Sequence, residues 1–303
     1  MKTFFYNLPE NRLRAGWRIL IFAALFWGLS ALIFVIKPLF GDLSKREFLH
    51  YYRIVIVSVL AIAATLAVIL SRKRLDKQSV VSLGLRVDKQ AWKDLLFGFA
   101  LSGMMAVFFL LLLLGLGLAE YQGFRFDQAS LVNHKTYGFI KIMSTISVVS
   151  LTILFLEDVL VGYWEELVFR GYIFQNMVAG IGLRWAIGIS CLLYGLIHVA
   201  NPNASLLSSS IIMLFGFLRL YGYLSTQMLW LSMGMHIGWN FFQGPVFGFA
   251  ASGHTQVTLV KLKLLGPNWL TGGAFGPEGS VLIIPMIILA LVAMRWWVSK
   301  FVL

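Results

Sequence analysis

Charged and polar side chains occur inside stretches of the sequence that are otherwise apolar. The densest set contains Glu165, Glu166 and, four residues after the second glutamate, Arg170. Adjacent glutamates on a helix point about 100° apart, whereas residues four apart lie one above the other. The spacing therefore predicts an ion pair between Glu166 and Arg170, and it leaves Glu165 to face a cavity as a general base. A salt-bridge cluster that only anchors a helix end is the alternative.

Two further polar sets follow along the chain, each with a spacing of four. They are Tyr194 with His198, in CLLYGLIHVANP, and His236 with Asn240, in SMGMHIGWNFFQGP. Ionisable residues within membrane spans are functional candidates by default, although such residues also hold helices together through hydrogen bonds. Together with Glu165, the two imidazoles and the amide can supply a base and oxyanion donors, or three metal ligands. Either arrangement suits hydrolysis by water.

The elements that must position these residues are membrane helices. Hydrophobic residues make up 59% of the 303 residues and charged residues 13%, against about 25% charged residues in soluble domains. A spanning helix needs about 20 apolar residues. The sequence predicts an all-α polytopic bundle, one integral membrane domain over residues 1–303, with eight spans at Trp17–Ile36, Ile54–Leu70, Leu95–Leu118, Phe139–Val161, Trp185–Val199, Leu206–Leu220, Tyr223–Phe242 and Val281–Trp297.

Some of these spans have distinct features. The first span follows three arginines but is too long for a cleaved signal peptide, so we expect a retained signal anchor. Asn201-Pro202-Asn203 separates the fifth span from the sixth, which predicts a tight hairpin or a re-entrant pair. The single cysteine, Cys191, lies within a span and indicates neither a disulfide framework nor a thiolate metal cluster.

The distribution of basic residues predicts the orientation. With eight spans, one side holds both termini and most of the 25 Lys and Arg residues, among them the run Arg72-Lys73-Arg74 as well as Arg170 and Arg219. Because short cytoplasmic loops are enriched in Lys and Arg, we expect both termini to be cytoplasmic, in the plasma membrane. The basic residues are dispersed beside apolar spans, so the net charge of +12 indicates contact with anionic membrane lipid and no nucleic-acid partner.

The three polar segments resemble the motifs of the CPBP family, which comprises CAAX proteases and bacteriocin-processing enzymes and is also called the Abi family. The motifs occur in the family's order, as Glu165-Glu166-x-x-x-Arg170, Tyr194-x-x-x-His198 and His236-x-x-x-Asn240. The resemblance covers residues 151–248, which we expect to form the catalytic core. Two features depart from the family pattern. Tyr194 stands where phenylalanine is commoner, and Glu157-Asp158 occupy a normally apolar place with no family role.

The resemblance implies an intramembrane protease of the type II CAAX prenyl endopeptidase kind, with eight helices and a conical, cytosol-accessible cavity. Carried over by motif, Glu165 would activate water with the help of His198, while His236 and Asn240 would stabilise the oxyanion. Glu166 and Arg170, supported by Tyr194, would hold the site together.

The resemblance leaves the cofactor open. The family is usually labelled metalloprotease, and Glu165, His198 and His236 could hold zinc as a His₂Glu set with water in the fourth position. A site without metal, which relies on Glu165 and His198, is the arrangement that we favour.

The predicted function is endopeptidase cleavage of a membrane-associated peptide or protein. One alternative is a non-catalytic membrane scaffold or bacteriocin-immunity protein that uses the same cavity. Another is a transporter, because intramembrane carboxylates and broken helices also occur there. The sequence shows no internal repeat of the kind that many transporters contain.

Overall fold

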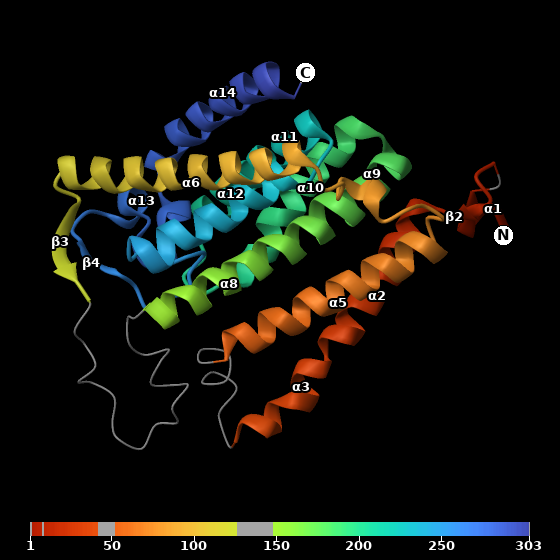
Figure 1. Ribbon diagram of the computed structural model, residues 1–303, viewed down its shortest axis with the longest axis horizontal. Coiled ribbons are helices and arrows are strands. Elements are labelled where there is room, and N and C mark those ends of the chain that lie inside the picture. The colour runs from red at the N-terminus through yellow and green to blue at the C-terminus, as the bar shows by residue number, and fades with distance from the viewer. Residues whose placement is uncertain (1, 8, 42–51, 126–147, 303) are drawn as a thin grey trace.

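The computed structural model describes residues 2–7, 9–41, 52–125 and 148–302 of the chain. Its long helices run back and forth along one direction (Figure 1). In chain order they are α2 (Ala15–Ser30) continued by α3 (Leu32–Ile36), α5 (Arg53–Arg74), α6 (Lys89–Gly115), α8 (Val148–Glu166) continued by α9 (Phe174–Ile181), α10 (Leu183–Ile197), α11 (Leu206–Thr226), α12 (Trp230–Phe241) and α14 (Ile284–Phe301). The all-α prediction is confirmed.

Short elements occupy the ends of the bundle. Near the N-terminus, α1 (Lys2–Phe5) leads into the paired strands β1 (Tyr6–Asn7) and β2 (Arg12–Leu13). At the opposite end, β3 (Ala119–Phe124) pairs with β4 (Val260–Leu264), and α13 (Asn268–Thr271) follows. These pieces connect spans and form no larger sheet in the described part of the chain.

Six of the helical segments are long and apolar enough to cross a membrane. They cover Ala15–Phe40, Arg53–Arg74, Lys89–Gly115, Leu183–Ala200, Leu206–Thr226 and Val281–Phe301. Two of the eight predicted spans are not among them. Helix α8 carries four acidic residues, and α12 has only 12 residues. The total of eight spans therefore stays a prediction, and residues 139–147 of the predicted fourth span lie outside the described residues.

The boundary of the seventh span differs from the prediction. Tyr223 belongs to the end of α11 and not to α12. The break comes at Gln227, whose backbone has φ +54, a left-handed conformation that ends a helix. Helix α12 then begins at Trp230. The polar residues Ser225, Thr226 and Gln227 mark this turn, whereas the predicted boundary lay a few residues earlier, between Leu220 and Tyr223.

Helix α12 lies in the centre of the bundle, closely packed against α6. An added Cβ at Gly238 would lie 2.5 Å from the Phe99 carbonyl oxygen, and one at Gly234 would overlap the Leu95 carbonyl. Small residues four apart allow two membrane helices to approach backbone to backbone. Ser102 Oγ also donates to the Met235 carbonyl at 2.7 Å. These contacts fix the position of α12 along its axis relative to α6, and with it the positions of His236 and Asn240.

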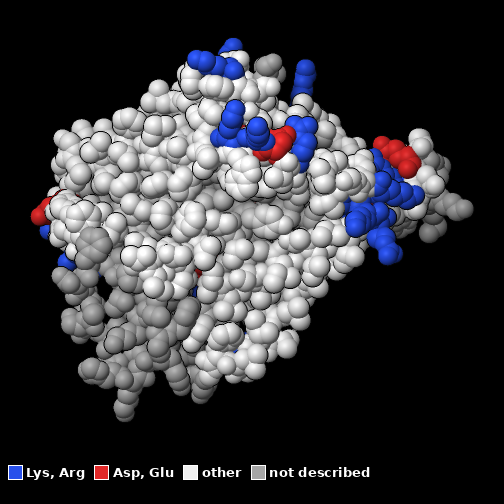
Figure 2. Space-filling model, viewed as in Figure 1, with Lys and Arg blue, Asp and Glu red and all other residues white. Residues whose placement is uncertain are grey.

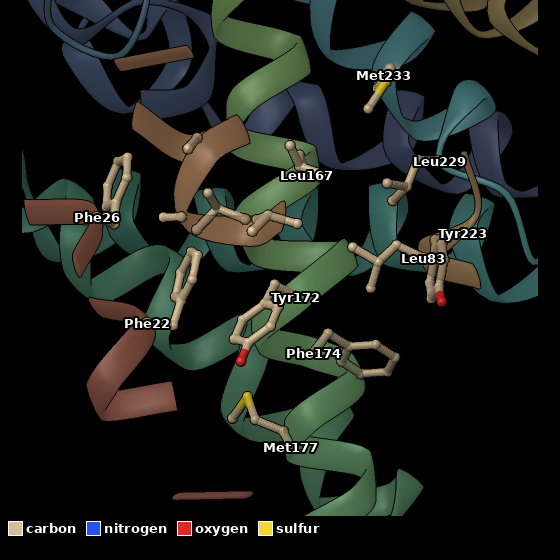
Figure 3. Close-up of a cluster of buried hydrophobic side chains, with 14 of the residues drawn as sticks. Phe22, Phe26, Leu83, Leu167, Tyr172, Phe174, Met177, Tyr223, Leu229 and Met233 are labelled. Carbon is tan, nitrogen blue, oxygen red and sulfur yellow. The ribbon is translucent and has the colours of Figure 1, made fainter. Parts of the chain in front are cut away.

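Helix α8 and the segment that follows it are fixed by a large apolar cluster (Figure 3). Phe22 from α2 stacks on Tyr172, with ring centroids 4.4 Å apart. Leu167, Tyr172 and Phe174 are fully or almost fully buried in this cluster. The cluster therefore holds the residues that directly follow Glu165 and Glu166.

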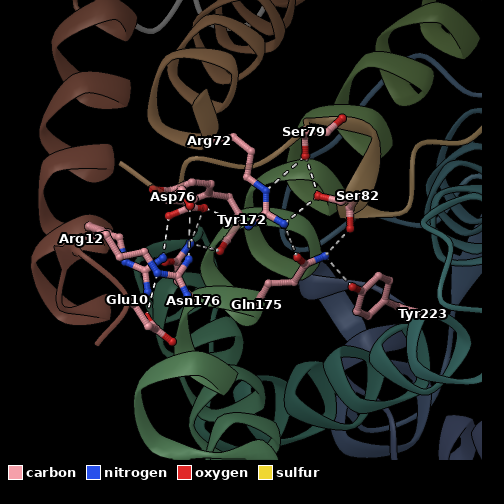
Figure 4. A network of polar contacts seen from close by, with 11 residues as sticks. Glu10, Arg12, Arg72, Asp76, Ser79, Ser82, Tyr172, Gln175, Asn176 and Tyr223 are labelled. Carbon is pink, nitrogen blue, oxygen red and sulfur yellow. Dashed lines mark hydrogen bonds and ion pairs between the residues drawn. The ribbon is translucent and has the colours of Figure 1, made fainter. Parts of the chain in front are cut away.

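Next to this cluster, a polar network that includes Tyr172 joins α2, α5 and α9 (Figure 4). Asp76 accepts from Arg18 at 2.8 Å and from Arg72 at 2.9 Å, and all three residues are buried. Asn176 donates to Asp76 at 3.3 Å. Because the two guanidinium groups share one carboxylate, the first span and α9 are tied to the end of α5.

Basic residues gather at the end of the bundle that carries the N-terminus and the C-terminal end of α14 (Figures 1 and 2). At this end, the Ala91 N–H that donates to Asp88 at 2.9 Å holds the pKa of that carboxyl below its usual range, with the nearby Arg86 adding to the effect.

The sequence-based assignment of Arg170 and Arg219 to this surface is wrong. Both are buried among the spans, because each faces a buried carboxylate.

Candidate active site

Glu166 is the centre of a buried polar cluster. Its Oε1 faces three cationic or imidazole groups, with Arg170 Nη1 at 3.2 Å, His236 Nδ1 at 3.0 Å and Arg219 Nε at 3.9 Å. The Ser232 hydroxyl donates to the other oxygen, Oε2. Glu166 thus joins α8, α11 and α12 around one fully buried carboxylate. The ion pair with Arg170 predicted from the spacing is confirmed.

Glu165 points in a different direction from Glu166 and lines a cavity. Tyr194 donates its hydroxyl hydrogen to Glu165 Oε2 at 2.9 Å. His236 Nε2 lies 3.8 Å from the same oxygen, which is an ion-pair distance but too long for a direct hydrogen bond. The two adjacent glutamates therefore have separate environments, as the 100° offset predicts.

Tyr194 connects these two environments. The guanidinium of Arg170 lies 4.2 Å from the centre of its ring and that of Arg219 lies 4.7 Å from it. Such contacts stabilise a desolvated cation on an aromatic face. Tyrosine in place of the commoner phenylalanine keeps the ring for the arginines and adds a hydroxyl for Glu165.

His198 and His236 have defined tautomers in their neutral forms. His198 Nδ1 lies 2.7 Å from the Tyr194 carbonyl, which can only accept, so this nitrogen carries the hydrogen. His236 Nδ1 faces the Glu166 carboxylate in the same way. In both rings Nε2 is left with a lone pair, available to the cavity that the two side chains line.

The cavity has a volume of about 1050 Å³ and is lined by Glu165, His198, His236 and Asn240 together. Each of the three polar segments thus contributes to one space. Arg219 and Glu278 also line it, as do the loops at 201–203 and 251–257. These loops follow α10 and α12 at the end of the bundle opposite Arg72-Lys73-Arg74.

One edge of the cavity reaches the outer surface of the bundle. Trp27 on α2 is 66% exposed and Ile197 on α10 is 46% exposed, and both line the cavity. Large apolar side chains with this exposure face lipid in a membrane-spanning bundle. The cavity is therefore accessible beside the lipid-facing surface as well as from its loops.

Two π-helical segments lie at or next to the polar motifs. One covers Leu167–Ile173, after the two glutamates, and the other covers Phe242–Val246, after Asn240. A π-turn inserts one residue into a helix and is frequent at functional sites. Arg170 lies within the first of these segments and faces Glu166, while Tyr172 of the same segment enters the apolar cluster.

Comparison with known protein families agrees with the motifs. Residues 144–242 match the family model described as type II CAAX prenyl endopeptidase Rce1-like. This segment is thus similar to proteases of the CPBP, CAAX-protease type. The match covers about a third of the chain and contains every residue of the three motifs. No curated protein matches the chain.

The similarity of this segment to CAAX proteases supports hydrolase activity of the endopeptidase class. The match ends at residue 242, so the Glu278 region and α14 lie beyond it. The individual roles of Glu165, His198, His236 and Asn240 in the CAAX-type segment stay predictions.

Three residues around the motifs were not singled out from the sequence. Arg219 is a charged residue inside an apolar span, which is the signal that marked the glutamates, yet it was counted as a surface charge. Ser232 lies one turn before His236, on the same helix face. Glu278 comes from a distant loop and accepts from Trp239 Nε1 at 3.0 Å. Only the tertiary fold connects Glu278 to the CAAX-type segment.

The three residues that could hold zinc, Glu165, His198 and His236, line the same cavity. Within the described ranges, however, no three His, Cys, Asp or Glu side chains lie close enough together to hold a metal ion. The Nδ1 atoms of the two histidines contact the Tyr194 carbonyl and Glu166, so Nε2 is the nitrogen of each ring that could bind a metal. The donor set as it stands does not fit a three-ligand site, so the steps below use only the protein's own residues.

Proposed function

We propose that this protein is an intramembrane endopeptidase that hydrolyses a peptide bond of a membrane-associated peptide or protein, with water activated by Glu165. The main support is that four side chains from three segments line one cavity. A non-catalytic binding cavity does not need a carboxylate held 3.8 Å from an imidazole nitrogen.

In the proposed reaction, Glu165 takes a proton from a water molecule that lies between it and His236. A contact of 3.8 Å between two polar atoms is suited to bridging by water. The water oxygen forms a bond to the carbonyl carbon of the substrate. Glu165 then returns the proton to the leaving nitrogen as the carbon–nitrogen bond breaks. His198, with its free Nε2, assists the proton transfers.

Asn240 supplies the amide N–H for the oxyanion that forms on the carbonyl oxygen. His236 can donate through Nε2 only in its protonated form, because Nδ1 already donates to Glu166. The carboxylates of Glu165 and Glu166, at 3.8 and 3.0 Å, balance that positive charge. The positions of these donors before substrate binds favour electrostatic stabilisation of the transition state.

The lipid-facing edge of the cavity favours a substrate that is held in the membrane, with lipid as the other partner. We also propose that both termini and the basic end of the bundle lie in the cytoplasm, at the plasma membrane. This orientation puts the loops at 201–203 and 251–257 on the opposite side. The cytosol-accessible cavity implied by the family resemblance would require these loops to face the cytoplasm. Labelling of single cysteines with a membrane-impermeant reagent distinguishes the two orientations.

Cleavage by the purified protein tests this function. Membrane-associated peptides would be incubated with it in detergent, and the products would be identified by mass spectrometry. Glu165→Gln keeps an acceptor for Tyr194 but removes the base, so we expect kcat to fall by about 10²–10⁴-fold. Asn240→Ala should lower kcat by about 10²–10³-fold.

The control variant is Glu120→Gln, because Glu120 is an exposed residue of β3 whose nearest cation is Lys263 at 3.9 Å. It should cleave like the wild-type protein. Cleavage by Glu165→Gln at the wild-type rate would exclude the mechanism, and full biological activity of that variant would favour the scaffold or immunity alternative.

A further inference from the structure

Two carboxyl groups of α8 have no part in the proposed reaction. Glu157 is 1% exposed and Asp158 is fully buried. None of their four carboxylate oxygens accepts a hydrogen bond of standard geometry within the described part of the chain. Buried carboxylates without such bonds are rare, since a buried polar group that lacks a partner destabilises the fold. These two residues therefore need an explanation beyond packing.

Glu157 faces the cavity, whereas Asp158 is not among the residues that line it. The nearest cation is Arg53, whose Nε lies 3.8 Å from Glu157 Oε2. The Ile54 backbone N–H at the start of α5 also faces this carboxylate. Arg53 lines the cavity as well and is 26% exposed on its side chain. The long ion pair leaves most of the acceptor capacity of Glu157 unused, and a ligand would reach its buried oxygens by displacing the part-exposed Arg53 side chain.

The charges in this part of the cavity favour a cationic ligand. Within the described residues, Arg53 is the cation that interacts with both Glu157 and the buried Asp158, so an added anion would meet an excess of negative charge. A Lys or Arg side chain, or a free amino terminus, would instead supply hydrogen-bond donors and the second positive charge.

The position of Glu157 relative to Glu165 sets where such a group would lie on a substrate. The two residues are eight apart on one helix, which corresponds to a rise of about 12 Å and an angular offset of about 80°. An extended peptide covers this distance in about three or four residues. A substrate whose scissile bond lies at Glu165 would thus bring a side chain three or four residues away to Glu157.

We propose that Glu157, with Arg53 beside it, forms a specificity subsite for a basic group of the substrate, three or four residues from the bond that is cleaved. This inference rests on the proposed endopeptidase function and adds a substrate class to it. It also assigns a role to Glu157, which stands at a place where the family pattern is apolar.

The test uses one neutral membrane-associated peptide and a set of peptides in which a single Lys replaces each residue in turn. We expect Lys at three or four residues from the cleaved bond to raise kcat/KM over the neutral peptide by about 10–100-fold, the range for a hydrogen bond to a charged group. In Glu157→Gln this ratio should fall to about one. Glu157→Lys should instead favour peptides with Glu at the same position.

The matched control is again Glu120→Gln, which should keep the wild-type ratio. Melting temperatures of all variants in detergent show whether each one folds. A wild-type protein that cleaves neutral and Lys-containing peptides equally would overturn the subsite and leave the proposed function intact. A preference for Lys that persists in folded Glu157→Gln would also overturn it.

A measurement of peptide binding distinguishes failure of the subsite proposal from failure of the proposed endopeptidase function. The same peptides, carrying a fluorophore, would be titrated with the Glu165→Gln protein, and anisotropy would give Kd. If no peptide is cleaved by wild-type protein but Lys still tightens binding through Glu157, the endopeptidase proposal fails and the cation subsite stands. Equal Kd values for neutral and Lys-containing peptides would refute the subsite without reference to cleavage.

Discussion

Replacement of Glu166 by alanine should destabilise the protein far more than replacement of its neighbour. Glu166 is the only carboxylate within 4 Å of Arg170 and Arg219 in the described part of the chain. Both arginines are buried, and they would lose the charge that compensates them. Removal of one partner of a buried ion pair typically destabilises by about 3–5 kcal/mol. His236 Nδ1 and the Ser232 hydroxyl would also lose their acceptor.

The comparison variant is Glu165→Gln. Glu165 lines the cavity and accepts one hydrogen bond, from Tyr194, which the glutamine carbonyl can also accept. We therefore expect this variant to unfold within about 1 kcal/mol of the wild-type protein. The two adjacent glutamates would thus have different roles, because Glu166 stabilises the fold and Glu165 faces the cavity.

The assay is thermal unfolding of purified proteins in one detergent, followed by tryptophan fluorescence and by gel filtration of the heated samples. Glu166→Ala should melt well below wild type, and Glu165→Gln close to it. Glu166→Gln should lie between them, since it keeps an acceptor but not the charge. If Glu166→Ala melts like wild type, the buried cluster does not hold the three helices together, and the division of roles between the glutamates is wrong.

Three further predictions concern single contacts and the orientation. Tyr194→Phe keeps the ring under Arg170 and Arg219 but loses the hydroxyl that contacts Glu165, so stability should change little while kcat falls by about tenfold, measured by peptide cleavage. Gly238→Ala should destabilise the folded protein by about 1–3 kcal/mol, because the added Cβ would lie 2.5 Å from the Phe99 carbonyl oxygen. Gly28→Ala is the control, since an added Cβ there has nothing within 4 Å. Equal melting temperatures of the two variants would contradict close packing of α6 and α12. In a Cys191→Ser background, a cysteine at Thr255 should react with a membrane-impermeant maleimide on intact cells and one at Lys73 only after permeabilisation; the opposite pattern would reverse the proposed orientation.

Local patterns in the sequence were sufficient for the class of fold and for the division between the two glutamates. Blocks of about 20 apolar residues can be satisfied only by membrane helices, because the backbone must form its hydrogen bonds internally in lipid. The ion pair of Glu166 with Arg170 also follows from helix spacing, since both residues lie on one helix. Periodicity predicted the ends of spans less well. The helix ends where Gln227 adopts a left-handed backbone conformation, after the short polar stretch Ser225-Thr226, which was too short to be singled out from the apolar residues around it.

The sequence by itself thus determined a bundle of membrane helices and the residues with chemistry to offer. The tertiary structure decided which of them meet. Arg219 joins Glu166, and Glu278 accepts from Trp239, although nothing in the spacing of these residues connects α8 to α11 or α12 to the C-terminal loops. The physical reason is that helix periodicity fixes relations over one or two turns. Relations between helices depend on packing, such as the close approach of α6 and α12 at Gly234 and Gly238.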